Sequence, residues 1–153
     1  MKPTLYVMIG VPGSGKSTYA NKLFSDLPII SRDIIRFNMI KHDEHYFTHE
    51  KEVFQQFVDE ITFQLRLGQS VVADATHVTK KSRRKLLTAI DKSIKDYDLV
   101  YVVMLTSLKE CLERNEKREG LAHVPDDVIY QAHELFECPY VEEDERIRQI
   151  ILI

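Results

Sequence analysis

Residues 10–17 read GVPGSGKS, and this stretch constrains the fold more than any other part of the sequence. It fits the pattern G-x-x-x-x-G-K-[S/T], which binds phosphate when a buried strand precedes it and a helix follows it. The apolar, β-branched run Leu5–Ile9 predicts that strand, and Lys16–Leu23 predicts that helix. Glycines permit the tight turn that aims backbone N–H groups at phosphate oxygens, and the helix N-terminus adds partial positive charge. The sequence therefore predicts a P-loop that binds a nucleoside triphosphate with Mg²⁺.

Each polar residue of the loop has an expected role. Lys16 is expected to reach the β- and γ-phosphates of ATP, and the Ser17 hydroxyl is expected to hold Mg²⁺. The predicted nucleotide-binding residues of the loop are Gly10, Pro12, Gly13, Ser14, Gly15, Lys16, Ser17 and Thr18. The chain lacks the D-x-x-G and N-K-x-D patterns of GTP switches. At 153 residues it is also short for a motor ATPase, so a small phosphotransferase is favoured.

Short apolar runs alternate with longer amphipathic runs along the chain, which predicts an α/β fold with a parallel sheet covered by helices on both faces. The predicted strands are Leu5–Ile9, Ile29–Ile30, Ser70–Ala73, Leu99–Leu105 and Ile147–Ile153. The predicted helices are Lys16–Leu23, Asp33–Ile40, His49–Leu67, one capped by Thr79, Leu108–Lys117 and Asp126–Phe136. We therefore expect a P-loop NTPase fold with about five strands, in a single kinase domain over residues 1–153. A small helical lid is expected at about residues 114–125.

Composition limits the location and the partners. The net charge of −3 provides no global basic field to attract nucleic acid, so a polyanion would need a local patch. No apolar run approaches the roughly 20 residues that span a bilayer, so no membrane partner is expected. The apolar N-terminal stretch is too short for a signal peptide and leads directly into the glycine loop. We therefore expect a cytoplasmic protein, and its oligomeric state stays open.

Ligands of open α/β sheets bind beyond the carboxyl ends of the strands, so polar residues that follow strands are candidate site residues. The stretch SRDIIR follows the second predicted strand and places Asp33 and Arg36 on one face of a helix start. Asp33 is a candidate general base for an acceptor hydroxyl, and Arg36 is a candidate ligand for a phosphate. Alternatively, the two residues form a surface ion pair, and Asp33 stabilises the helix N-terminus.

Two further candidates follow the strand at residues 70–73. Asp74 occupies a position where P-loop proteins often place a carboxylate near Mg²⁺ or its waters, although a capping role is the alternative. Arg83 shares a helical stripe with Leu87 and Ile90, which aims it toward the sheet and makes it a candidate substrate ligand. The neighbouring basic residues, such as Lys81 and Lys85, point outward and are typical of a solvated face, although a polyanion could use them.

A basic helix end forms the last candidate cluster. Arg114 and Arg118 precede Gly120, where the predicted helix breaks into a loop. Phosphoryl transfer requires positive charge around the moving group, so these arginines are expected to fold over ATP as part of a lid. An ordinary charged helix C-terminus is the alternative, because cations are favoured there in any case.

Taken in order, four motifs resemble the kinase module of phage and bacterial 5′-hydroxyl polynucleotide kinases, within the wider zeta-toxin-like P-loop kinases. They are P-G-S-G-K-S-T, R-D-x-x-R, D-A-T-x-V with a later arginine, and R-N-x-x-R followed by V-P, and they extend over residues 5 to about 125. The resemblance implies that Asp33 activates the 5′-OH, that Arg36 grips the acceptor phosphate, and that Asp74 has a supporting role. It also implies that Arg118, and less clearly Arg114, contacts the donor phosphates.

The acceptor is the least determined part of this prediction. A polynucleotide 5′-OH end, of DNA or RNA, is the leading candidate. A sugar, nucleoside or antibiotic is the alternative acceptor, and a non-catalytic ATP-binding module is the alternative class. Tyr46 and Phe47 are expected to pack their own segment more than to stack a nucleobase, and His42, His45 and His49 are not expected to bind a metal.

Overall fold

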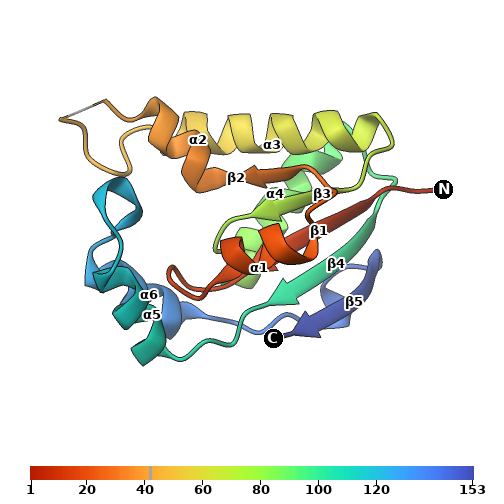
Figure 1. Ribbon diagram of the computed structural model, residues 1–153. Coiled ribbons are helices and arrows are strands. Elements are labelled where there is room, and N and C mark those ends of the chain that lie inside the picture. Colours follow the sequence, from red (N-terminus) through yellow and green to blue (C-terminus); the bar gives the residue numbers. More distant parts are fainter. Residues whose placement is uncertain (42) are drawn as a thin grey trace.

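A computed structural model of the chain describes residues 1–41 and 43–153, and Figure 1 shows a central sheet surrounded by helices. The strands are β1 (Thr4–Ile9), β2 (Ile29–Ser31), β3 (Val71–Asp74), β4 (Asp98–Val103) and β5 (Ile147–Leu152). All strand pairs are parallel, and the order across the sheet is β2-β3-β1-β4-β5. The expected α/β fold with a five-stranded parallel sheet is therefore confirmed, with strand ends that differ from the expectation by one or two residues.

Helices connect the strands. The α-helices are α1 (Lys16–Leu23), α2 (Arg32–Met39), α3 (Glu50–Arg66), α4 (Lys80–Asp91), α5 (Leu108–Glu116) and α6 (Asp126–Leu135). Two short 3₁₀ turns are η1 (Gly120–Ala122) and η2 (Val141–Glu143). The hydroxyl of Ser31 accepts a hydrogen bond from the Ile34 amide and caps α2, and Thr79 caps α4 as expected. Within the described residues, no helix is long and apolar enough to cross a bilayer.

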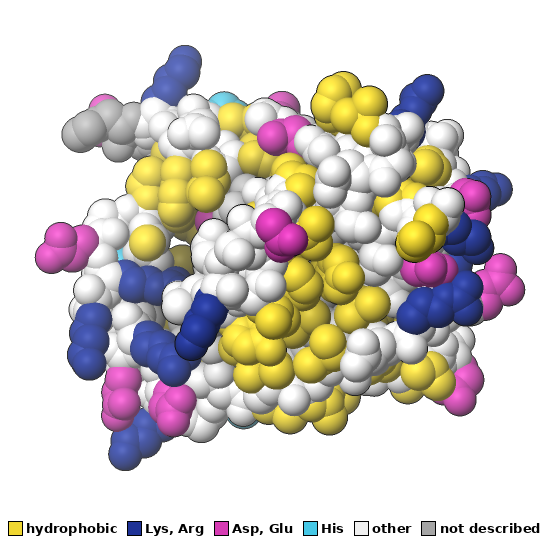
Figure 2. Space-filling model, turned by 45° about the vertical axis from the view of Figure 1, so that its right-hand side comes forward, with side chains coloured by type: hydrophobic (Ala, Val, Ile, Leu, Met, Phe, Trp, Pro, Cys, Tyr) yellow, Lys and Arg dark blue, Asp and Glu magenta, His cyan; other side chains and the backbone are white. Residues whose placement is uncertain are grey.

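Two hydrophobic clusters hold the helices on opposite faces of the sheet. Alternate residues of β1 and β4, which share one face of the sheet, pack against the apolar stripes of α3 and α4. These stripes include Phe57, Ile61 and Leu87. The other face packs against Ala20 and Phe24, on and just after α1, which lies in front of the sheet in Figure 1. Figure 2 shows apolar side chains gathered across the middle of the surface that it displays.

The strand register fixes where the site forms. Asp74, the last residue of β3, pairs with Met8 of β1 and with Ser31 of β2. The carboxyl ends of these three neighbouring strands are therefore level. The P-loop leaves β1 at this edge, and α2 leaves β2 there, so Arg32 and Asp33 come within reach of the P-loop.

Candidate active site

The P-loop between β1 and α1 has the backbone that a phosphate cradle needs. Gly13 and Gly15 have φ values of 85° and 91°, in the left-handed region that favours glycine. A Cβ atom on Gly13 would lie 2.6 Å from the carbonyl oxygen of Cys111, so α5 packs tightly against the loop. Ser14 Oγ is buried without a hydrogen-bond partner among the described residues. An oxygen-rich ligand in the loop is therefore compatible with both the backbone and the unpaired hydroxyl.

Ser17 and Asp74 form a pair of oxygen ligands beside Lys16. The Ser17 hydroxyl donates a 2.6 Å hydrogen bond to Asp74 Oδ2, and Oδ1 of the same carboxylate is buried without a partner in the described part of the chain. Burial raises the pKa of Asp74, while the Lys16 charge and the Ser17 hydrogen bond oppose the rise. Mg²⁺ prefers oxygen ligands and usually keeps several waters, so an unpaired carboxylate oxygen beside a hydroxyl fits this ion.

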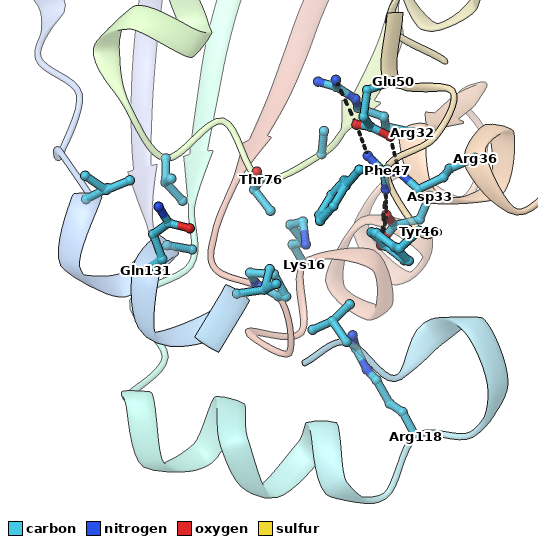
Figure 3. A pocket seen from close by; sticks show the side chains of 17 residues that line it. Lys16, Arg32, Asp33, Arg36, Tyr46, Phe47, Glu50, Thr76, Arg118 and Gln131 are labelled. Atoms are coloured by element: carbon cyan, nitrogen blue, oxygen red, sulfur yellow. Dashed lines mark hydrogen bonds and ion pairs between the residues drawn. The ribbon is translucent and has the colours of Figure 1, made fainter. Parts of the chain in front are cut away.

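Asp33 belongs to a hydrogen-bonded network around the Arg36 guanidinium, which Figure 3 shows. Arg36 donates from Nε and Nη2 to Glu50, with both distances at 2.7 Å, and from Nη1 to Asp33 Oδ1. The Tyr46 hydroxyl accepts from Arg36 Nη1 and donates to Asp33 Oδ1, both at 3.2 Å. Asp33 Oδ1 is therefore fully engaged, whereas Oδ2 accepts no hydrogen bond from the described residues and remains available to a ligand.

The network holds its charges in fixed states. Burial alone would lower the pKa of Arg36, but the Glu50 hydrogen bonds and the charges around it raise the pKa above its usual range. Burial raises the pKa of Tyr46 to about 12, and the Asp33 carboxylate adds to the rise. Arg36 is consequently a permanent cation and Tyr46 a permanent hydrogen-bond donor at neutral pH. Arg36 is 6% exposed and makes four hydrogen bonds, so a ligand phosphate would have to compete with Glu50 for it.

Asp33 and Lys16 line the same cavity of about 330 Å³, which Figure 3 shows from close by. Its charged wall consists of Lys16, Arg32, Asp33, Arg36, Glu50 and Arg118. Its apolar and aromatic wall includes Tyr46, Phe47, Val78, Val124, Val128 and Leu135. Four cations face two carboxylates, so the cavity suits a ligand that combines an anionic group with an apolar or ring-shaped part.

A second cavity, of about 680 Å³, lies on the other side of the P-loop. Gly13, Ser14, Gly15 and Thr18 line it, together with Arg114, Met104 and Thr106. Arg118 lines both cavities. The protein therefore has two neighbouring cavities that share Arg118, and Lys16 lines the smaller one.

The segment after α5 carries the two arginines that were expected in a lid. Arg114 Nη1 lies 3.4 Å from the Gly13 carbonyl oxygen, and Arg118 Nη1 donates to the Ala122 carbonyl at 3.3 Å. Asn115 is fully buried between them and bonds both backbone groups of Val124, at 2.7 Å and 3.1 Å. This side chain closes the loop that carries Arg118 back onto α5.

The structure does not bring Arg83, the expected substrate ligand, to either of the two cavities. Its guanidinium is 1% exposed and donates two 3.0 Å hydrogen bonds to Glu143 and one of 2.9 Å to the His77 carbonyl. The helical stripe correctly indicated that Arg83 points inward, but its partner comes from a turn 60 positions later. Asp74 likewise lines neither cavity and instead faces Ser17.

The other predicted residues lie around the P-loop or near it. The Gly10 amide donates to the Thr76 carbonyl at 2.9 Å, which ties the loop to the end of β3, and Pro12 lines the smaller cavity. His49 pairs with Glu44, whereas His42 lies outside the described residues.

Sequence reasoning missed Glu50 and Asn115 and assigned Tyr46 and Phe47 to packing. A charge pattern was the available signal for Glu50, because the cations Arg32 and Arg36 are followed by an acidic helix start at that residue.

The fold and the paired cavities define a P-loop kinase-like protein. A family model described as an AAA domain matches residues 5–139, and the chain belongs to this AAA domain family. The resemblance expected from the motifs is confirmed at the level of the P-loop kinase fold.

Several solved structures are similar to the chain. A chain of the Pnkp1/Rnl/Hen1 RNA repair complex has a TM-score of 0.73 at 20% identity, over 88% of this chain and 44% of that chain. A sugar kinase from Janibacter sp. HTCC2649 has a TM-score of 0.67 at 15% identity, over 100% of this chain and 85% of that one. Chaetomium thermophilum Kti12 in complex with ADP-AlF3 has a TM-score of 0.67 at 16% identity, over 97% of this chain and 88% of that chain. The chain thus spans less than half of the repair-complex chain, and these likenesses establish the fold.

Proposed function

We propose that this protein transfers the γ-phosphate of ATP to a hydroxyl group of a second substrate. The observation that carries the proposal is Oδ2 of Asp33, which accepts no hydrogen bond from the described residues. It belongs to a carboxylate in the wall of the smaller cavity, which Lys16 and Arg118 also line. The larger cavity, lined by the outer side of the P-loop, is suited to the nucleotide. A base in one compartment and a phosphate cradle in the next are the parts that phosphoryl transfer requires.

In this proposal Asp33 orients the acceptor hydroxyl and takes its proton on Oδ2. The acceptor oxygen forms a bond to the γ-phosphorus, the bond from that phosphorus to the β,γ-bridging oxygen breaks, and ADP leaves. Lys16 and Arg118 neutralise charge on the moving phosphoryl group, and Arg114 contacts the donor phosphates from the P-loop side. Ser17 and Asp74 would hold Mg²⁺, which supplies further neutralisation of the β- and γ-phosphates when it is bound.

We propose a polynucleotide with a 5′-OH end as the acceptor. The smaller cavity has an excess of positive charge on one wall and an apolar wall that includes Phe47, Val124 and Val128. A terminal nucleotide has a phosphate that can bind the charged wall and a flat base that can pack on the apolar wall. An acceptor phosphate could bind the Arg36 guanidinium in competition with Glu50, which accepts two hydrogen bonds from it. The motif order and the fold shared with a chain of an RNA repair complex support the same acceptor.

A small hydroxyl compound is the second candidate, because the cavity of about 330 Å³ is large enough to enclose one completely. The sugar kinase fold, which matches the whole chain, is consistent with it.

The test incubates the protein with γ-labelled ATP, Mg²⁺ and either 5′-OH DNA, 5′-OH RNA, or a panel of sugars and nucleosides. Label on an oligonucleotide, absent when its 5′ end is already phosphorylated, is the expected result. Label on a panel compound alone would replace the polynucleotide with a small acceptor. Transfer to none of them would contradict a kinase of either kind and favour a non-catalytic module.

A further inference from the structure

The ring of Phe54, on α3, holds two cations from two other helices. The Arg32 guanidinium carbon lies 5.3 Å from the ring centre, and the Lys85 ammonium nitrogen lies 4.7 Å from it. Arg32 begins α2, and Lys85 lies on the outer side of α4. We name Arg32, Phe54 and Lys85 the Phe54 cluster. Each contact with the ring stabilises one cation electrostatically, and it also restricts the position of that cation.

The positive charge of the Phe54 cluster is poorly compensated. Glu50 makes 2.7 Å hydrogen bonds to Arg36, whereas its contact with Arg32 is 3.3 Å. Arg32 Nε is buried without a partner among the described residues. Among the described residues, Lys85 also forms no salt bridge. The exposed Lys81, one helical turn before it, forms none with them either. Two like charges close to one ring repel each other, so an anion in contact with either cation would be stabilised.

The Phe54 cluster continues directly from the smaller cavity. Arg32 lines that cavity and also contacts Phe54, so it belongs to both. In Figure 3, Arg32 and Glu50 lie at one end of the group of lining side chains, and Arg118 lies at the other end. An acceptor whose reactive hydroxyl lies near Asp33 and Lys16 can therefore extend past Arg32 onto the outer face of α4. A compound confined to the cavity would not reach Lys85.

We propose that the Phe54 cluster binds the backbone of a single strand on the 3′ side of its terminal nucleotide, with phosphates at Arg32 and Lys85. This inference rests on the proposed function and adds a path for the rest of the strand. The local patch also accounts for polyanion binding by a chain whose net charge is −3. The phosphate contacts are independent of base identity, so the path predicts affinity that grows with strand length and falls with salt.

The test compares a 5′-OH mononucleotide with an oligonucleotide of about ten residues as acceptors, over a series of salt concentrations. Wild-type protein should show a higher kcat/KM for the oligonucleotide. Lys85→Glu should remove most of that gain, with KM for the oligonucleotide raised about tenfold at low salt. The slope of log KM against log salt should fall by about 0.7, because one single-strand phosphate contact is lost. Lys85→Arg, which keeps the charge, should restore both.

Lys92→Glu is the matched control, because Lys92 is also exposed and caps the far end of the same helix. It should leave the length dependence and the salt slope unchanged. If Lys85→Glu and Lys92→Glu behave alike on the oligonucleotide, the proposed strand path is wrong although the kinase assignment stands. If wild-type protein phosphorylates no oligonucleotide, the proposed function itself fails. These two failures are therefore distinguishable in one experiment.

Discussion

Asp33 presents two carboxylate oxygens with different surroundings. Oδ1 is held by Arg36 and Tyr46, while Oδ2 is free among the described residues. We predict that Asp33→Asn lowers kcat by about 10²–10⁴-fold, because an amide cannot accept the proton of the acceptor hydroxyl. KM for ATP should change little, since Asp33 does not line the larger cavity. Steady-state kinetics measure both quantities, and Asp26→Asn, in an exposed turn, is the control. Full turnover of the Asp33→Asn protein would assign the base to another group.

His77 makes the stability of the protein depend on pH. Its ring is 5% exposed, lies 3.0 Å from the Met8 carbonyl oxygen and stacks on Phe57. Burial lowers the pKa of His77 to about 4, whereas the pKa of a histidine in an unfolded chain is about 6.5. Between these values the unfolded state binds more protons than the folded state. The free energy of unfolding should therefore fall as the pH drops from about 7 to about 4, by roughly 3 kcal/mol from this group.

His77→Asn tests the assignment, because His77 has a φ of 46° and asparagine tolerates this left-handed conformation. Urea unfolding at a series of pH values should give a flatter dependence between pH 7 and pH 5 for this variant than for the wild type. His133→Asn, at an exposed position, should keep the wild-type slope. Equal slopes for wild type and His77→Asn would mean that His77 is not the group responsible.

Between α5 and α6, the side chain of Asn115 fixes the end of the segment that carries Arg118. Asn115 accepts from the Val124 amide and donates to the Val124 carbonyl, as a neighbouring strand would. We predict that Asn115→Ala lowers stability by about 1–3 kcal/mol, because both backbone groups then lose their partner. Hydrogen exchange should show faster exchange at the Val124 amide, and kcat should fall because Arg118 is less well positioned. Unchanged exchange at Val124 would contradict the role of Asn115.

The elements themselves were largely predictable, and long-range side-chain partners were not. The P-loop, the strand β1 and the helix α1 follow from contiguous residues, and the amphipathic period of α3 and α4 appears within each helix. Arg83 shows the limit, because its inward direction is local information but its partner Glu143 is contributed by η2. Glu50 is the converse case, since its bonds to Arg36 depend on how α2 and α3 pack. Asp33 could be proposed from the sequence because a strand end and a P-loop place it at the same edge of the sheet.

At the scale of the whole molecule, the two cavities on either side of the P-loop predict the order of events. They are separate compartments that share Arg118, so ATP and the acceptor can be bound together. We predict direct transfer within a ternary complex. Initial velocities over a grid of both substrates should give intersecting double-reciprocal lines, and the transferred phosphorus should invert its configuration. Parallel lines together with ATP–ADP exchange in the absence of acceptor would instead reveal a phosphorylated protein intermediate. Because Arg118 belongs to both compartments, Arg118→Ala should lower kcat more than it raises either KM.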